Sequence, residues 1–269
     1  MNRAVLEALA RERLAAQDEA RVIERFSSRY PGLSLEDAYE IAKGVHEERL
    51  RQGRRAVGRK IGFTNPAMWA AFGVSQPIWG YMYDTTVHDL ARERAWSLAG
   101  FTETKIEPEI VLHFGKAPPA GDAAQVLACI DWIAPGFEIV QSPFPAWKFD
   151  AADAVAVAGL HAMLLIGERK SVAELGPGTE RALERFRLTL LRNGEPVASG
   201  SGADVLGSPL AAIAHLVATL QAQPAFAPIA AGDIVTTGTI TVAQPLVAGE
   251  RWSTAIEGIA LDGIEATFR

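Results

Sequence analysis

The sequence predicts an α+β protein with a small helical N-terminal part and a larger, mostly β part. Apolar residues recur at helical spacing up to about residue 55, whereas short β-type runs separated by Gly, Pro and Asp prevail from about residue 80. Of the 269 residues, 49% are hydrophobic and 22% are charged, which is typical of a globular protein with a sizeable core. We therefore expect a helical part over residues 1–79 and a mixed β domain over residues 80–269.

Composition excludes several classes of function. The formal net charge of -6 leaves no basic surplus to neutralise nucleic-acid phosphates. The single cysteine, Cys129, cannot form an internal disulfide or a zinc cluster. Because there is no run of eighteen uninterrupted apolar residues and the N-terminus is charged, we expect neither a membrane span nor a signal peptide. A cytoplasmic enzyme is the expected class.

The N-terminal part begins with two predicted helices. Residues 3–24 carry an apolar stripe at helical spacing, which Arg13 interrupts. A second helix starts after Ser34, a capping residue, with Asp37 three positions on in the first turn. A short strand over residues 57–64 and a short helix from Asn65-Pro66 through Met68 and Phe72 to Gly73 complete this part.

The β part is predicted as a series of short strands with two helices. The pair Asn193-Gly194 between apolar runs is a strong hairpin signal. Helices are expected over residues 122–132 and 209–221, and residues 76–82 are an aromatic, turn-rich stretch that is either a domain junction or core. The expected strands cover residues 86–90, 105–113, 137–140, 162–166, 186–192, 233–237, 251–256 and 263–268.

The most informative stretch is Lys105–Leu112, which contains Glu107 and Glu109. Side chains alternate along a strand, so these two carboxylates share one face, where they repel each other unless a cation lies between them. Hard oxygen ligands suit Mg²⁺ or Mn²⁺, although a solvated strand face explains the pattern equally well. Pro108 cannot donate to a sheet ladder and therefore indicates an edge or a bulge.

Glu138 and Lys60 are further candidates. Glu138 stands in an apolar β run, where an acidic residue is costly to bury without a partner, so it is either the third metal ligand or a solvent-facing position. Lys60 lies between Gly58 and Gly62, which would let a ligand approach the backbone closely. Alternatively, Lys60 is a surface residue of a strand.

An ordered set of motifs resembles the 2-keto-4-pentenoate hydratase and 4-oxalocrotonate decarboxylase family of the fumarylacetoacetate hydrolase superfamily. Each motif is weak by itself, but together they follow the family's order over nearly the whole chain. They are Gly58–Thr64, Gly73–Gly80, Lys105–Ile110, Pro135–Val140, Asn193–Glu195, Gly200–Leu210, Gly232–Gly238 and Ala248–Glu250.

The resemblance implies a mixed β-roll of the fumarylacetoacetate hydrolase C-terminal type in a homo-oligomer. It implies that Glu107, Glu109 and Glu138 bind Mg²⁺ or Mn²⁺ and that Lys60 is a catalytic and substrate-binding residue. It also places Thr237 and Gly238 in a late substrate-binding loop.

The chain departs from the family pattern at two places. Ile78 replaces an aspartate that is a proton-transfer candidate in the family's hydratases. A family segment resembling Asp-Asn-Ala-Ser is apolar here and contains His161, which either lies in the core or contacts substrate as a catalytic residue. The general base is left open between His161 and a metal-bound water.

The resemblance implies a metal-dependent hydratase of a 2-hydroxy-2,4-dienoate or 2-oxo-4-enoate in aromatic meta-cleavage catabolism, acting through a metal-chelated C2 enolate. Aromatic residues such as Trp79 would give such a hydratase an apolar substrate pocket. The alternative is a 4-oxalocrotonate-type decarboxylase of a 2-oxo-3-enedioate, for which Lys148 would bind the second carboxylate. A third possibility is an inactive partner with the same fold, and a paired pathway enzyme is a further expected partner.

Overall fold

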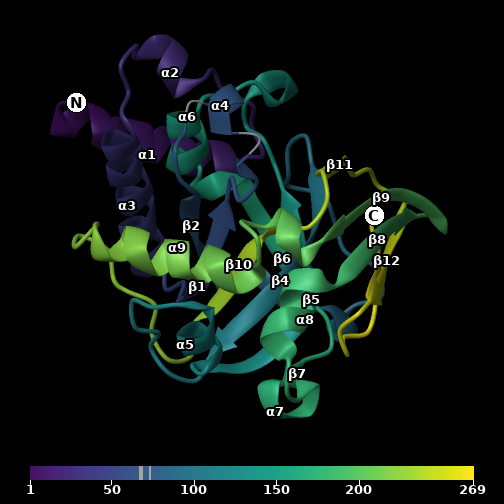
Figure 1. Ribbon diagram of the computed structural model, residues 1–269. Helices are drawn as coiled ribbons and strands as arrows, with labels where there is room; N and C mark the ends of the chain where they lie inside the picture. Colours follow the sequence, from purple (N-terminus) through teal and green to yellow (C-terminus); the bar gives the residue numbers. More distant parts are fainter. Residues whose placement is uncertain (67–68, 73) are drawn as a thin grey trace.

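The computed structural model describes residues 1–66, 69–72 and 74–269. A nine-stranded mixed sheet in the order β2-β1-β10-β4-β5-β6-β3, with β11 and β7 beside β4 and β5, forms the body of the protein, and a four-stranded sheet in the order β13-β12-β8-β9 flanks it (Figure 1). The large sheet contains β1 (Ala56–Gly62), β2 (Ile78–Tyr83), β3 (Val87–Asp89), β4 (Lys105–Phe114), β5 (Ile130–Val140), β6 (His161–Ile166), β7 (Lys170–Ser171), β10 (Ile234–Thr239) and β11 (Gln244–Pro245). The small sheet contains β8 (Arg187–Arg192), β9 (Glu195–Ser201), β12 (Arg251–Glu257) and β13 (Glu265–Thr267).

Helices cover the large sheet. Those of the N-terminal part pack on one another and on α6, to one side of the sheet (Figure 1). The helices are α1 (Arg3–Asp18), α2 (Phe26–Arg29), α3 (Leu35–Arg51), α4 (Trp69–Phe72), α5 (Ala123–Leu127), α6 (Ala151–Ala156), α7 (Val172–Leu175), α8 (Thr179–Arg185) and α9 (Pro209–Gln221). This architecture confirms the α+β class.

Several local predictions are confirmed. The Ser34 side chain accepts a hydrogen bond from the Asp37 backbone N–H, and the Asp37 side chain accepts one from the Ser34 backbone, which completes a capping box. Asn193 and Gly194, with φ of 52° and 90°, form the two-residue turn between β8 and β9. Helix α9 has the predicted bounds. Pro108 lies next to a bulge: the register of β10 with β4 shifts between the pairs Thr236–Val111 and Thr239–Glu109, and Glu109 directly follows Pro108 on β4.

Other predictions are wrong or are decided by the structure. The first helix ends at Asp18 rather than near residue 24, because Ala20 adopts a φ of 50° and the N–H groups of Ala20 and Arg21 bond back to Gln17 and Ala16 in a Schellman motif. Of the two alternatives for residues 76–82, the structure bears out core, since residues 78–83 form a buried strand. In the short helix expected from Asn65, Met68 and Gly73 lie outside the described residues.

The largest error concerns residues 122–140. The expected helix over residues 122–132 is only the short α5, and the strand expected at residues 137–140 begins at Ile130. Pro135 argues against such a long strand, because proline has no N–H to donate. Its carbonyl accepts from the N–H of Gly167, and the nitrogen of the same residue points to the same edge of β5. At that edge the neighbouring strand changes from β7 to β6. No ladder hydrogen bond is lost there. Helices α6 and α8 were not predicted.

The register of the large sheet sorts its side chains onto two faces. One face packs against the main core under the helices. The other carries a smaller apolar cluster: Met82, Val111, Ala134, Leu164 and Ile166. Glu109 follows the same alternation as Val111, and Glu138 follows that of Ala134, so the acidic residues and this small cluster share one face.

The helical and β parts share the large sheet. Strand β1 pairs with β10 in the large sheet, so residues before and after position 79 share one sheet, and the division after residue 79 stays a prediction. The segment Gly202–Gln221 is apolar and long enough to cross a membrane by length and composition alone. The α9 part of it buries Leu210, Ile213 and Leu216, as a core helix does.

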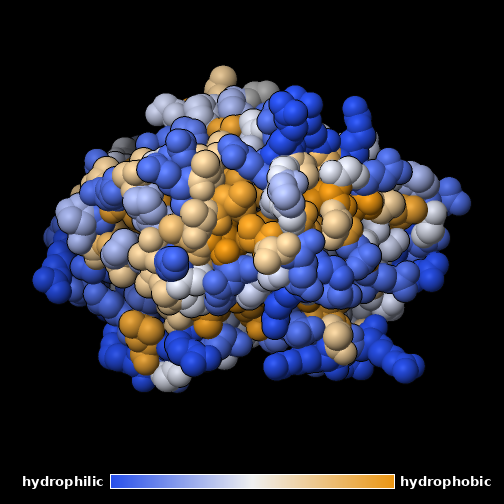
Figure 2. All heavy atoms as spheres, turned by 60° about the horizontal axis from the view of Figure 1, so that its bottom comes forward, coloured by the Kyte–Doolittle hydropathy of each residue, from blue (hydrophilic) through white to orange (hydrophobic). Residues whose placement is uncertain are grey.

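One outer face is unusually apolar. Figure 2, which brings the bottom of Figure 1 forward, shows hydrophobic side chains gathered across the middle of this face with charged and polar residues around them. Contiguous apolar areas of this kind are typical of interaction surfaces.

Candidate metal centre

Three carboxylates meet on the face of the sheet that carries the small apolar cluster. Glu107 and Glu109 alternate along β4, and Glu107 lies directly opposite Glu138 on β5. One oxygen from each of the three residues lies within 4.8 Å of the others. The antiparallel pairing of β4 with β5 thus brings Glu138, which is distant in sequence, next to Glu107 and Glu109.

The hydrogen bonds of the cluster are unevenly shared. Glu109 Oε2 accepts from the backbone N–H of Gly238 at 2.8 Å, but its buried Oε1 has no hydrogen-bond partner among the described residues. Glu138 Oε1 lies 2.7 Å from His161 Nδ1, and its Oε2 lies 3.1 Å from Lys60 Nζ. Glu138 is therefore neutralised by the protein itself, whereas Glu109 is not.

The ionisation of the three groups follows from this arrangement. Burial, with the charge of Glu138 nearby, raises the pKa of Glu107 to about 7 against the pull of Lys60. Burial and the neighbouring carboxylates raise the pKa of Glu109 well above its ordinary value. Burial also opposes ionisation of Glu138, but Lys60 and His161 outweigh it and lower its pKa. Two of the three groups thus resist ionisation until a cation arrives.

Lys60 is held beside the cluster by strand pairing. It lies on β1 opposite Thr236 of β10, and its side chain is 3% exposed. Burial lowers its pKa, but the charges of Glu138, Glu107 and Glu109 outweigh burial and raise it. A Cβ on Gly159, which has a φ of +63°, would lie 2.7 Å from Lys60 Cδ, so the chain there passes close over the lysine stem. Lys60 is thus a buried site residue rather than a surface residue.

The residues present fit a hard divalent cation. Three carboxylates face one ammonium, and the unpartnered Oε1 of Glu109 needs a positive partner that the described part of the chain does not supply. All-oxygen donor sets of this kind suit Mg²⁺ or Mn²⁺.

His161 lies on the far side of Glu138. Nδ1 donates to Glu138, since an ionised carboxylate can only accept, and Nε2 lies 2.9 Å from Thr86 Oγ1. Both ring nitrogens are therefore engaged within the protein. Sequence reasoning did not identify Thr86, because a threonine in a turn before a strand carries no signal of its own.

The other predicted site residues are dispersed. Gly238 touches the cluster, whereas the hydroxyl of Thr237 donates to the backbone carbonyl of Ile110. Trp79 is opposite Ile61 in the β1–β2 pairing, whereas Lys60 is opposite Gly80. Because side chains alternate along a strand, Trp79 lies on the other face of the sheet from Lys60 and the carboxylates. Its Nε1 donates to Gln223 at 2.9 Å.

Lys148 is exposed beside a 3-10 turn, and Lys105 lies closer to the cluster in the fold. Lys105 precedes Glu107 by two positions on the same face of β4, and its Nζ lies 3.9 Å from the centre of the Trp147 ring. Sequence reasoning assigned no role to Lys105, although its alternation with Glu107 was visible.

The sequence is similar to a known protein family and to curated relatives. A model of the fumarylacetoacetate (FAA) hydrolase C-terminal family matches residues 75–262. The chain is 31% identical to a 2-hydroxyhexa-2,4-dienoate hydratase of Comamonas testosteroni, over 92% of both chains. It is 30% identical to a 4-oxalocrotonate decarboxylase of Pseudomonas putida, over 100% of this chain and 98% of that one.

A solved structure of similar fold carries a metal. The 4-oxalocrotonate decarboxylase from Pseudomonas putida G7, complexed with magnesium and adipate, superposes with a TM-score of 0.90 at 29% identity, over 100% of this chain and 99% of that one. These findings confirm the resemblance drawn from the motifs. The chain belongs to the fumarylacetoacetate hydrolase family, in the group that contains the 2-keto-4-pentenoate hydratases and 4-oxalocrotonate decarboxylases.

Proposed function

We propose that the protein is a cytoplasmic, divalent-metal-dependent hydro-lyase that hydrates a 2-hydroxy-2,4-dienoate, or its 2-oxo-4-enoate tautomer, in aromatic meta-cleavage catabolism. The observation that carries the proposal is the buried cluster of Glu107, Glu109 and Glu138, in which a carboxylate oxygen of Glu109 lacks a partner among the described residues. The hydratase from Comamonas testosteroni, similar over 92% of the chain, supports the substrate class.

The three glutamates would hold Mg²⁺ or Mn²⁺, which supplies Lewis-acid polarisation of a 2-oxo acid when bound. Lys60 is the cation of the chain that is best placed for the substrate. Its ammonium, 3.1 Å from Glu138 Oε2, can hold the substrate carboxylate or the negative charge that develops on the C2 oxygen. Such a preorganised charge is effective because Lys60, Glu109 and Glu138 are buried, where water screens their charges little.

His161 acts in this proposal as a positioning residue for Glu138. Its Nδ1–H orients one carboxylate oxygen, and Thr86 in turn fixes the imidazole ring. Supports of this kind typically set the affinity of a metal site. Because both ring nitrogens are already engaged, we do not give His161 the role of a base that touches substrate.

Ile78 bears on both candidate functions. It removes the aspartate that is the proton-transfer candidate in the family's hydratases, but it also makes the wall beside Lys60 apolar. Ile78 lies opposite Gly62 in the β1–β2 pairing. A Cβ placed on Gly62 would be 3.2 Å from Ile78 Cγ1 and 3.9 Å from Lys60 Nζ, so Ile78 and the lysine ammonium lie on either side of the same glycine. The wall beside the lysine is therefore apolar, which suits a monocarboxylate with a hydrocarbon end.

The second candidate function is decarboxylation of a 2-oxo-3-enedioate. It is favoured by the similarity of the fold to the decarboxylase complexed with adipate, a dicarboxylate. In this protein, Lys105 is better placed than Lys148 to bind a second carboxylate, because it shares a face with Glu107 and Lys148 is exposed.

A spectrophotometric assay separates the two functions. The protein with Mg²⁺ is given 2-hydroxypenta-2,4-dienoate and, separately, 2-oxo-3-hexenedioate, and loss of each chromophore is followed. The hydratase proposal expects metal-dependent loss of the dienoate that Glu107→Gln abolishes and that Glu184→Gln, an exposed control, retains. Turnover of the diacid alone, with release of CO₂, would assign the decarboxylase. Activity with neither, together with no metal binding, would leave an inactive partner with the same fold.

We also propose that the protein is a homo-oligomer and that it works beside a paired pathway enzyme. The apolar face in Figure 2 supports the first part, since such areas are typical of subunit interfaces. Light scattering on the purified protein tests it, and a monomeric mass at micromolar concentration would contradict it.

A further inference from the structure

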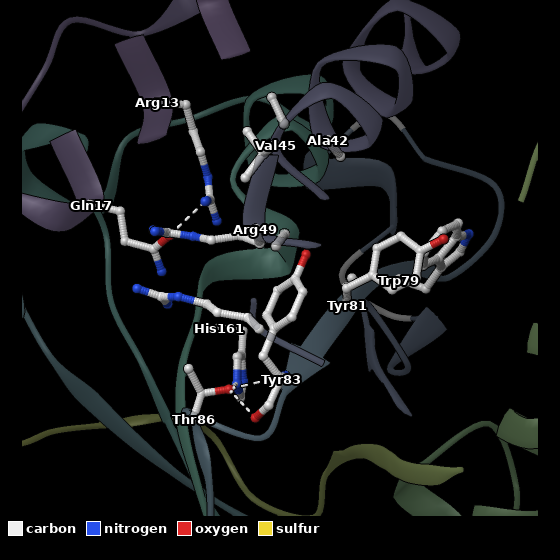
Figure 3. Close-up of a pocket in the computed structure, with 14 residues that line it drawn as sticks. Arg13, Gln17, Ala42, Val45, Arg49, Trp79, Tyr81, Tyr83, Thr86 and His161 are labelled. Atoms are coloured by element: carbon white, nitrogen blue, oxygen red, sulfur yellow. Dashed lines mark hydrogen bonds between the residues drawn. The ribbon is translucent and has the colours of Figure 1, made fainter. Parts of the chain in front are cut away.

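A second hollow lies behind His161, away from the carboxylates. It opens between α1, α3 and β2. The cavity itself is narrow, about 20 Å³, and it continues into about 510 Å³ of empty space that includes open solvent. Figure 3 shows Arg13 and Arg49 reaching into it above Tyr83 and His161. Neither Lys60 nor any of the three glutamates lines it, but His161 and Thr86 do, so it lies directly behind the metal centre.

The lining of this hollow is strongly cationic. It contains three arginines, Arg13, Arg49 and Arg54, and no aspartate or glutamate. This is unusual in a chain with a formal net charge of -6. Converging guanidinium groups are the usual protein ligand for carboxylate and phosphate groups.

The one nearby carboxylate serves Arg49. Asp18 receives both Nη1 and Nη2 of Arg49, and Gln17 Oε1 accepts from the same guanidinium at 3.0 Å. Across residues 1–66, 69–72 and 74–269, neither Arg13 nor Arg54 has a carboxylate within 4.0 Å. Two of the three cations therefore have no ion pair of their own, although the charge of Asp18 acts on both.

Arg13 is the more informative of the two. Its residue is 6% exposed, yet its guanidinium has one hydrogen bond, from Nη1 to Gln17 Oε1 at 2.5 Å. Burial, helped by Arg49 and Arg54 and opposed by Tyr83 and Asp18, lowers its pKa to about 10, so it remains charged at neutral pH. None of its guanidinium nitrogens is among the buried polar atoms without a partner, so those that Gln17 does not engage face the open space of the hollow, where an anion can meet them.

The remaining lining suits a small organic anion. Ala42, Val45 and Ala156 provide an apolar wall beside the arginines. A few polar groups that converge across an apolar wall are typical of small-ligand pockets.

We propose that this pocket is an anion-binding site in which Arg13 and Arg54 hold the oxyanion of a small molecule, a carboxylate or a phosphate. The anion supplies the negative charge that the lining lacks, and Arg49 stays paired with Asp18. The site does not depend on the metal centre or on the reaction assigned to it.

Calorimetric titration of the metal-free protein tests the site, because without metal the acidic cluster repels anions. Inorganic phosphate and glutarate are titrated separately into the wild type and into Arg13→Gln, Arg54→Gln and Arg11→Gln. Arg11 is exposed on the same helix as Arg13 and is the matched control. Circular dichroism verifies that each variant is folded, and Arg54→Gln decides the question if Arg13→Gln does not fold.

We expect one site per chain for at least one probe, unchanged in Arg11→Gln and about 10- to 100-fold weaker in the two pocket variants, as for a lost charged hydrogen bond. Binding of phosphate alone would identify an inorganic or phosphorylated ligand, and binding of glutarate alone an organic acid. The proposal is overturned if neither probe binds the wild type at about 50 mM, a concentration well above a millimolar Kd. It is equally overturned if both pocket variants bind as tightly as Arg11→Gln.

Discussion

Replacing Glu107 by glutamine tests whether the acidic cluster is built for a cation. The substitution removes a negative charge and keeps the shape of the side chain. In the absence of metal, the folded protein must otherwise hold Glu107 close to Glu138 in a buried site, where burial raises the pKa of Glu107 to about 7. We therefore expect the metal-free variant to be more stable than the wild type at alkaline pH.

The magnitude follows from the pKa. The rise from the ordinary value of 4.5 to about 7 means that the folded state binds a proton more tightly than the unfolded state. Stability then falls as pH rises between these two values, and above pH 7 the full cost of about 3 kcal/mol is present. At pH 5 the folded protein keeps Glu107 protonated, and the cost is about 1 kcal/mol. Glu107→Gln should remove both costs.

Thermal unfolding of the metal-free proteins at pH 5 and pH 8 measures this effect. The variant should exceed the wild type by roughly 6 °C at pH 8 and by only about 2 °C at pH 5. Saturating Mg²⁺ should reverse the order at pH 8, because only the wild type gains a ligand. Glu184→Gln, on an exposed position, should follow the wild type. A metal-free variant that is less stable than the wild type at pH 8 would refute the reasoning, since it would show that Glu107 stabilises the fold without a cation.

Three other substitutions probe the neighbours of the cluster. His161→Leu removes the donor to Glu138, so the affinity for Mn²⁺ should fall about 10- to 100-fold by calorimetry, and kcat should recover at saturating metal. An unchanged affinity would argue against positioning. Lys60→Met should lower kcat/KM by about 10²-fold without weakening Mn²⁺ binding, since it removes a cation beside the metal ligands. Gly238→Ala, whose Cβ would lie 2.0 Å from Thr64 Oγ1, should cost roughly 2 kcal/mol more in urea unfolding than Gly249→Ala, which has a similar φ and nothing within 4 Å.

The parts of the fold that the sequence predicted are those that local chemistry decides. The Ser34 capping box, the Asn193-Gly194 turn and the bounds of α9 each depend on residues within a few positions of one another. The long strand β5 could not be predicted in this way, because Pro135 contradicts a strand locally. It is tolerated only because β6 and β7 leave a gap beside it.

The same distinction applies to the site. Glu107 and Glu109 follow from strand alternation, and Glu138 follows from the cost of a carboxylate in an apolar run. The pairing of His161 with Glu138 and Thr86 depends on the register of β5 with β6, which the sequence does not display. Arg13 had a visible signal, since it interrupted the apolar stripe of the first helix. Its meaning, a buried cation facing a pocket, needed the packing of α1 against α3.

The cost and the use of the acidic cluster have one physical origin. The carboxylates share their face of the sheet with the apolar cluster of Met82, Val111, Ala134, Leu164 and Ile166, so the face is dry beside them. Low polarity makes each uncompensated carboxylate unfavourable, which raises the pKa values of Glu107 and Glu109. It equally strengthens the attraction for a divalent ion and for the charge that Lys60 would hold in the reaction. A polar substitution in the apolar cluster, which leaves every ligand residue unchanged, should therefore weaken metal binding and catalysis together.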